Sequence, residues 1–205
     1  MIVIGLTGSI GMGKTTAANM LREMGIPVHD SDATVHRLMG PKGKAVPEVG
    51  KNFPEALKTD DAGEPYIDRA TLGRCVFADR NRKKTLENIL HPMVREDSDH
   101  FKAEMLKRGH RVVVLDIPLL FEIGDEKRVD ASICISAPYE MQRERVLARK
   151  GMTSEKFERI SAGQMPDAEK RKRANYVVGS DKGMEDMRQQ LMNVINSLQA
   201  TRGQG

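Results

Sequence analysis

Residues 5–16, GLTGSIGMGKTT, contain four glycines and end on a lysine followed by two threonines. Gly8, Gly13, Lys14 and Thr15 complete the pattern G-x-x-x-x-G-K-[ST]. A short apolar run, residues 2–6, precedes the pattern, and apolar residues at helical spacing follow Lys14. Because the pattern requires this strand, loop and helix order, the stretch predicts a phosphate-binding loop, or P-loop.

The chemistry of a P-loop follows from its backbone. Successive N–H groups point into one concavity, and the N-terminus of the following helix adds positive potential. Lys14 reaches the β- and γ-phosphates of a nucleotide, and the hydroxyl of Thr15 binds the accompanying Mg²⁺. The loop therefore predicts a nucleoside triphosphate and magnesium as ligands, but it does not identify the group that receives the phosphate.

The rest of the chain predicts an α/β fold. Five short stretches rich in Val and Ile have the continuous apolar character of buried parallel strands, and helical segments lie between them. These stretches are residues 2–6, 26–30, 111–116, 131–136 and 175–179. We expect a five-stranded parallel sheet flanked by helices, with the whole chain, residues 1–205, as a single P-loop domain.

Two regions depart from the strand and helix alternation. Residues 33–108 show no convincing buried strand, and their long helical stretch is interrupted by Pro92, so we expect a helical insert. Residues 138–174 form a second helical region that is highly charged. In this region Thr153 is placed to cap a helix.

Composition narrows the class of protein. The mean hydropathy is −0.48 and no apolar stretch approaches 18 residues, which argues against a membrane protein. The N-terminus lacks the basic and long apolar parts of a signal peptide, so we expect a cytoplasmic location.

Cys75 and Cys134 form no CxxC pattern and are expected to be buried small hydrophobes. The chain has 33 Lys and Arg residues and 29 Asp and Glu residues. This surplus of positive charge would suit nucleic acid or a small polyanionic ligand equally.

The kind of molecule that accepts the phosphate can be inferred by excluding other classes of nucleotide-binding protein. The guanine-reading pattern N-K-x-D is absent, which argues against a GTPase. Only 4% of the residues are aromatic, so the chain lacks the stacking side chains of a nucleic-acid-dependent ATPase. Phosphoryl transfer from ATP to a small molecule remains.

Acidic residues follow two of the expected strands. Asp30 and Asp32 come at the end of the second strand, where ligands of open α/β sheets bind. Either carboxylate could orient an acceptor hydroxyl and take its proton, and either could instead cap the next helix. Asp116 ends the strand at 111–116 and has the position of an acid that binds Mg²⁺.

Arg145 and Arg149 are one helical turn apart in the 138–174 region. At this spacing two guanidinium groups share a helix face and can both reach a triphosphate when a lid closes. Exposed arginines are common on helices, so the spacing alone is a weak signal.

Taken together, these motifs resemble the dephospho-coenzyme A kinases. The resemblance rests on GLTGSIGMGKTT, the DSD of residues 30–32, IDRATLGRCVF followed by LENILHPMV, DIPLLFE, QRERVLAR and QMPDAEKRKRA, in this order. It covers nearly the whole chain, and its most specific parts are the P-loop together with His91-Pro92 and PLLFE.

The resemblance implies transfer of the ATP γ-phosphate to the 3′-hydroxyl of dephospho-coenzyme A. It also implies a P-loop kinase fold in which residues 33–108 bind the acceptor coenzyme and residues 138–174 form a small lid. Catalysis would fall to Asp32, Lys14 and Arg145, while the metal would be held by Thr15 and Asp116. ATP would be bound by Gly11, Met12, Gly13, Lys14, Thr15, Thr16 and Arg149, and the acceptor by Asp32, His91, Pro118, Leu119 and Leu120.

One position departs from the pattern that the resemblance implies. Many members carry an asparagine in the turn after the last strand, where this chain has Ser180, so the contact with adenine is left open. We expect a monomer or small homo-oligomer with no nucleic acid or membrane partner.

Two other functions remain as alternatives. A shikimate, nucleoside or nucleoside monophosphate kinase would share the P-loop, the acidic residues and a lid. Such a function would not explain an insert that contains LHPMV. A protein that binds nucleotide without turnover is disfavoured by Lys14, Thr15, Asp32 and Asp116 together.

Overall fold

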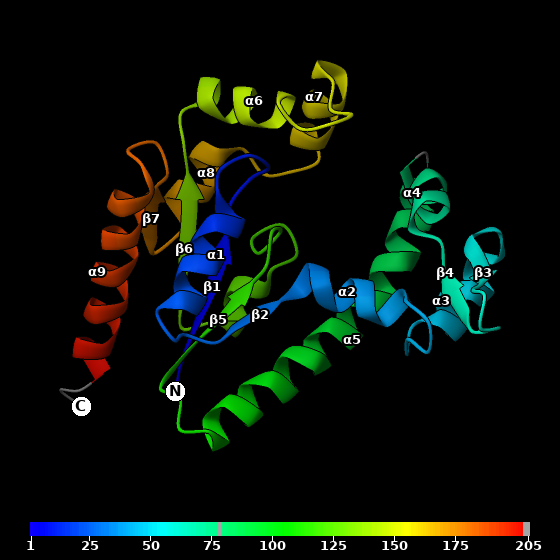
Figure 1. Cartoon of the computed structure of the whole chain (residues 1–205), viewed down its shortest axis with the longest axis horizontal. Helices are drawn as coiled ribbons and strands as arrows, with labels where there is room; N and C mark the ends of the chain where they lie inside the picture. Colours follow the sequence, from blue (N-terminus) through cyan, green and yellow to red (C-terminus); the bar gives the residue numbers. More distant parts are fainter. Residues whose placement is uncertain (78, 203–205) are drawn as a thin grey trace. The chain divides into compact units, whose positions relative to one another are not determined.

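The computed structural model describes residues 1–77 and 79–202 of the chain (Figure 1). The first half contains β1 (Ile2–Thr7), α1 (Lys14–Glu23), β2 (Val28–Asp30), α2 (Ser31–Met39), α3 (Val46–Asn52), η1 (Pro54–Ala56), β3 (Leu57–Thr59), β4 (Pro65–Ile67), α4 (Arg69–Phe77) and α5 (Arg80–Lys107). The second half contains β5 (Val112–Asp116), η2 (Asp125–Arg128), β6 (Ala131–Ser136), α6 (Tyr139–Leu147), α7 (Ser154–Ala162), α8 (Asp167–Arg173), β7 (Tyr176–Gly179) and α9 (Met184–Arg202).

The five predicted strands form one sheet with the order β2-β5-β1-β6-β7, which confirms the expected parallel architecture. Strand β1 lies at the centre, and its residue Ile4 is in register with Val114 of β5 and with Ala131 of β6. The carboxyl ends of parallel strands share one edge of a sheet. The P-loop therefore leaves the central strand at the edge where ligands of such sheets bind.

The sheet belongs to a compact unit made of Met1–His29 and the chain from Met105 onward. Helices α1 and α9 contact each other and cover one face of the sheet, where alternate strand residues such as Ile4, Val114 and Ile133 point into a common core (Figure 1). Leu21 of α1 and Leu191 of α9 complete this core and are fully buried. Helix α1 is thus fixed by the packing of its apolar face.

Helix α8 packs against β6 on the opposite face of the sheet, where Ser136 donates a hydrogen bond to Asp167. Cys134 points to this face and is fully buried, as expected. Burial raises the pKa of the Cys134 thiol to about 12, so the thiol is neutral at physiological pH. Cys75 is only partly buried, which differs from the expectation.

The second compact unit comprises Asp30–Glu104 and has its own core, which includes Val49, Phe53 and Leu90. Most of it is helical, but β3 and β4 form an antiparallel hairpin. We expected no buried strand in this region, and the hairpin adds two short strands that this expectation did not include. Each strand has only three residues and β3 is exposed throughout, so no alternating apolar pattern marks it in the sequence.

Helix α5 runs unbroken through Pro92 for 28 residues, so the expected interruption at this residue is wrong. Proline removes one backbone hydrogen bond from a helix, but packing can offset that loss. Here Leu90, Met93 and Val94 on either side of Pro92 all pack into the second core. Within residues 1–77 and 79–202, no helix combines the length and the apolar character needed to cross a membrane.

Candidate active site

The P-loop occupies residues 8–13, between the end of β1 and the start of α1. Gly13 precedes the helix with φ of 94°, and Gly11 has φ of 80°. Both angles lie in the left-handed region that glycine adopts without strain. A Cβ on Gly11 would also lie 2.5 Å from Val146 Cγ2 and 2.9 Å from the carbonyl oxygen of Gln142. Helix α6 therefore packs directly on the loop, and only glycine fits between them.

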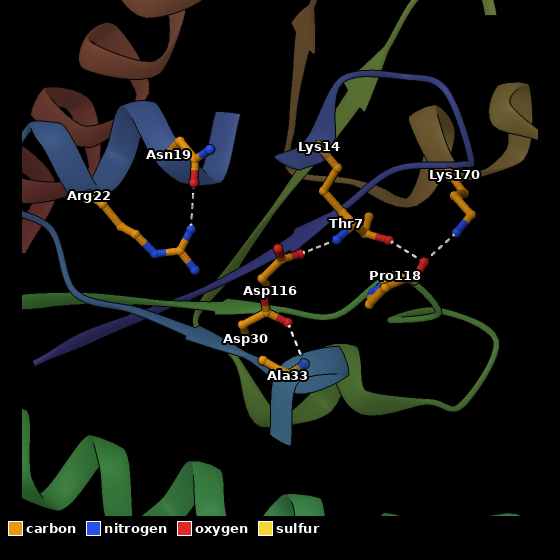
Figure 2. A network of polar contacts seen from close by, with 9 residues as sticks. All are labelled: Thr7, Lys14, Asn19, Arg22, Asp30, Ala33, Asp116, Pro118 and Lys170. Atoms are coloured by element: carbon orange, nitrogen blue, oxygen red, sulfur yellow. Dashed lines mark hydrogen bonds and ion pairs between the residues drawn. The ribbon is translucent and has the colours of Figure 1, made fainter. Parts of the chain in front are cut away.

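Lys14 and Asp116 meet at the carboxyl edge of the sheet. The Nζ of Lys14 donates to Oδ1 of Asp116 at 2.5 Å (Figure 2). Asp116 is the last residue of β5 and is 3% exposed, while the Lys14 side chain is 15% exposed. The structure thus brings together the P-loop lysine and the strand-end acid that the sequence singled out separately.

The oxygen atoms beside the loop fit a magnesium ion carried by a nucleotide. Thr15 is exposed in the first turn of α1, and Asp116 offers a carboxylate at the end of β5. Mg²⁺ is usually bound through one or two protein oxygens together with substrate phosphates and water. In the part of the chain that the structure describes, no group of three or more His, Cys, Asp or Glu side chains is placed to hold a metal ion.

A spacing of two residues would place Asp30 and Asp32 on one face of an extended strand. The structure instead places Asp30 at the end of β2 and Asp32 in α2. Asp30 ends β2 and caps α2, because its Oδ1 accepts a hydrogen bond from the Ala33 N–H at 2.9 Å (Figure 2). Asp32 lies in the first turn of α2 and is exposed. The two carboxylates therefore differ, since one is occupied by the backbone and the other faces solvent.

Arg145 and Arg149 do not share a helix face, because α6 ends at Leu147. Arg149 lies beyond the helix and is exposed. Arg145 donates from Nη1 to the hydroxyl of Ser180 at 2.8 Å and from Nη2 to the Ser180 carbonyl at 2.7 Å. Both of these hydrogen bonds are directed at the turn after β7.

Ser180 connects that turn to the P-loop. It is 6% exposed, and its hydroxyl donates to the carbonyl oxygen of Met12 at 2.8 Å. Its backbone N–H donates to Ser136 at the end of β6. At the position where the sequence left an adenine contact open, the structure therefore places a link between Arg145 and the phosphate-binding loop.

The segment after Asp116 is held by a buried lysine that the sequence analysis did not single out. The carbonyl oxygen of Pro118 accepts hydrogen bonds from Thr7 Oγ1 and from Lys170 Nζ, each at 2.9 Å (Figure 2). Lys170 Nζ also lies 2.9 Å from Glu122 Oε1, and that oxygen accepts from the Met165 N–H at 2.8 Å. Lys170 is fully buried. Nothing in its charged, helical sequence context distinguishes it from its exposed neighbours.

The expected acceptor contacts occupy different environments. Pro118 and Leu119 are partly exposed after β5, whereas Leu120 is fully buried beneath Gly5. Leu120 therefore belongs to the core under the sheet. His91 lies in α5 within the second unit and is partly exposed.

Comparison with known proteins identifies the family of this chain. The family model described as dephospho-CoA kinase matches residues 2–186. The dephospho-CoA kinase of Mesorhizobium japonicum is 48% identical over 203 residues, which cover 99% of this chain and all of that protein.

Solved structures agree with this relationship. A Thermus thermophilus protein is 39% identical with a TM-score of 0.80, and the match covers 96% of this chain and 97% of that one. The dephospho-CoA kinase of Campylobacter jejuni is 26% identical with a TM-score of 0.70, and the match covers 98% of each chain. The chain belongs to the dephospho-CoA kinase family.

Proposed function

We propose that this protein transfers the γ-phosphate of ATP to the 3′-hydroxyl of dephospho-CoA, giving CoA and ADP in the last step of CoA biosynthesis. The observation that carries the proposal is the contact between Lys14 and Asp116 beside the P-loop, in a chain that matches the family over residues 2–186. Shikimate or a nucleoside as acceptor is not favoured, because family membership extends over nearly the whole chain.

On the nucleotide side, the backbone N–H groups of residues 11–16 and the ammonium of Lys14 would bind the phosphates. Thr15 and Asp116 would hold Mg²⁺, which when bound supplies positive charge to the transferred group. The surrounding positive groups are in place before the reaction, so they stabilise the developing charge without reorganisation.

On the acceptor side, Asp32 would orient the 3′-hydroxyl and take its proton as the new O–P bond forms. Its exposure and its freedom from capping support this choice over Asp30. We propose that the second unit, with His91, binds the coenzyme, and that Pro118 and Leu119 contribute from the segment held by Lys170.

The test is release of ADP from ATP and Mg²⁺ by the purified protein, with and without dephospho-CoA. We expect ADP release to require dephospho-CoA and the product to carry a new 3′-phosphate, identified by mass spectrometry and NMR. Lys14→Ala should fold and lose most of this turnover, because it removes the cation that faces the phosphates. ADP release that is independent of dephospho-CoA, or a folded Lys14→Ala variant with normal turnover, would overturn the proposal.

A further inference from the structure

One residue of the P-loop, Ile10, has both of its backbone polar groups bound by side-chain amides. Its N–H donates to Oε1 of Gln164 at 3.0 Å, and its carbonyl oxygen accepts from Nε2 of Gln142 at 2.8 Å. The two glutamines are 154 and 132 positions away in the sequence. Gln142 lies in α6 and is 6% exposed, and Gln164 follows the end of α7.

Met12, two residues further along the loop, is also bound by groups from outside the loop. The carbonyl oxygen of Met12 accepts from the Ser180 hydroxyl, which in turn accepts from Arg145 of α6. The sulfur of Met12 accepts from the Ala137 N–H at 3.1 Å. Side chains and backbone from the 137–180 region thus bind Ile10 and Met12 of the loop.

A loop built from glycines needs such support. Glycine has more backbone freedom than other residues, so a P-loop with three glycines in residues 8–13 loses much entropy when it adopts one conformation. Phosphate binding requires that successive N–H groups point inward, and the carbonyl groups between them must then find partners elsewhere. Gln142 supplies one such partner at Ile10, and Gln164 binds the N–H of the same residue.

We propose that Gln142 and Gln164 are positioning residues that set the conformation of the P-loop for phosphate binding. The 138–174 region then contributes to nucleotide affinity through the loop itself, in addition to any closure over the substrates. This inference rests on the proposed binding of ATP by the loop. Neither glutamine needs to touch the nucleotide for its effect.

The two amides have opposite roles, which provides a matched test. Gln164→Glu keeps an acceptor for the Ile10 N–H, whereas Gln142→Glu replaces a donor with an acceptor opposite the Ile10 carbonyl. Both changes add one negative charge beside Ile10, but Gln142 is buried and Gln164 is only partly buried, so the cost of that charge differs between them. Gln142→Met, which removes the donor without adding charge, therefore separates the hydrogen bond from the charge.

We expect Gln142→Glu to weaken the binding of ATP, measured by calorimetry, roughly five- to thirty-fold more than Gln164→Glu does. The KM for dephospho-CoA should stay within about twofold of the unmodified protein in both. The matched control is Gln189→Glu, which changes an exposed glutamine of α9 that bonds only Asn193 among the described residues. This control should bind ATP normally.

Four outcomes separate the possibilities. Equal ATP affinity of the two glutamate variants overturns the inference, and so does a fall in melting temperature without any change in affinity, which would indicate a purely structural role. If Gln142→Glu does not fold, Gln142→Met removes the donor without adding charge, and normal ATP affinity in that variant also overturns the inference. If the unmodified protein itself binds no ATP, the proposed function fails and not the role of the glutamines alone.

Discussion

Asp30 and Asp32 stand two residues apart but differ in what their carboxylates do. Asp30 accepts the Ala33 N–H and so satisfies one of the free N–H groups at the start of α2. Asp32 is exposed in the first turn of the same helix. Asparagine caps a helix about as well as aspartate, so a change that removes charge but keeps the cap can distinguish the two positions.

We predict that Asp32→Asn lowers kcat about 10²- to 10⁴-fold, the usual effect of removing a general base, and leaves ATP affinity nearly intact. Asp30→Asn should retain most activity because its cap is preserved. Steady-state kinetics with dephospho-CoA as the varied substrate, together with ATP binding by calorimetry, checks both expectations. A larger loss for Asp30→Asn would transfer the role of base to Asp30. Mild effects in both variants would mean that positioning and charge carry the reaction.

At the scale of elements, Lys170 connects α8 to the segment that follows β5. Its ammonium is fully buried and binds both the Pro118 carbonyl and the Glu122 carboxylate. Desolvation makes a buried charge costly unless its partners remain. The segment after Asp116 is therefore tied to a helix on one face of the sheet by contacts that tolerate little change.

We predict that Lys170→Met, which keeps most of the length of the side chain but removes its charge, lowers the free energy of unfolding by roughly 3–5 kcal/mol. The loss arises because Glu122 keeps its charge without its buried partner. Urea unfolding followed by circular dichroism measures the change.

The matched control for this prediction lies on the same helix. Lys172→Met alters an exposed lysine of α8 and should change the free energy of unfolding by less than about 0.5 kcal/mol. Adding Glu122→Leu to Lys170→Met should recover part of the loss, since it removes the unpaired carboxylate. An unfolding curve for Lys170→Met that matches the unmodified protein would show that the ion pair is not needed for stability.

At the scale of the whole molecule, the chain divides into a unit that contains the P-loop and a unit that comprises Asp30–Glu104. Each has its own apolar core, which is compatible with one unit binding the nucleotide and the other binding the acceptor. If the second unit binds the coenzyme as proposed, a change there should affect one substrate and not the other.

We predict that His91→Ala in α5 raises the KM for dephospho-CoA about tenfold, the effect of losing one or two polar contacts, and leaves the KM for ATP unchanged. Initial rates with each substrate varied in turn provide the measurement. Asn88→Ala, three residues earlier on the same helix and exposed, is the control that should leave both KM values unchanged. Equal effects on the two KM values would favour a packing role for His91.

The sequence alone was sufficient for the sheet and for the phosphate-binding loop. The five strands and the helix that begins at Lys14 were predicted because their signals are local: continuous apolar runs, a glycine pattern and helical periodicity. Thr153 was likewise predicted to cap a helix, and its side chain does accept the Lys156 N–H at the start of α7. The short β3–β4 hairpin was not predicted, because β3 is exposed throughout and no alternating apolar pattern marks it.

Only the tertiary structure decided which residues that are distant in the sequence bind one another. Arg145 binds Ser180, Lys170 binds Glu122 and Pro118, and Gln142 binds Ile10, over separations of 35 to 132 positions. No local pattern marks Lys170 or Gln142, because a lysine or glutamine in a charged helix has the same sequence context whether it faces solvent or a buried carbonyl. Burial and long-range contact assign their roles, and both arise only when distant segments pack together.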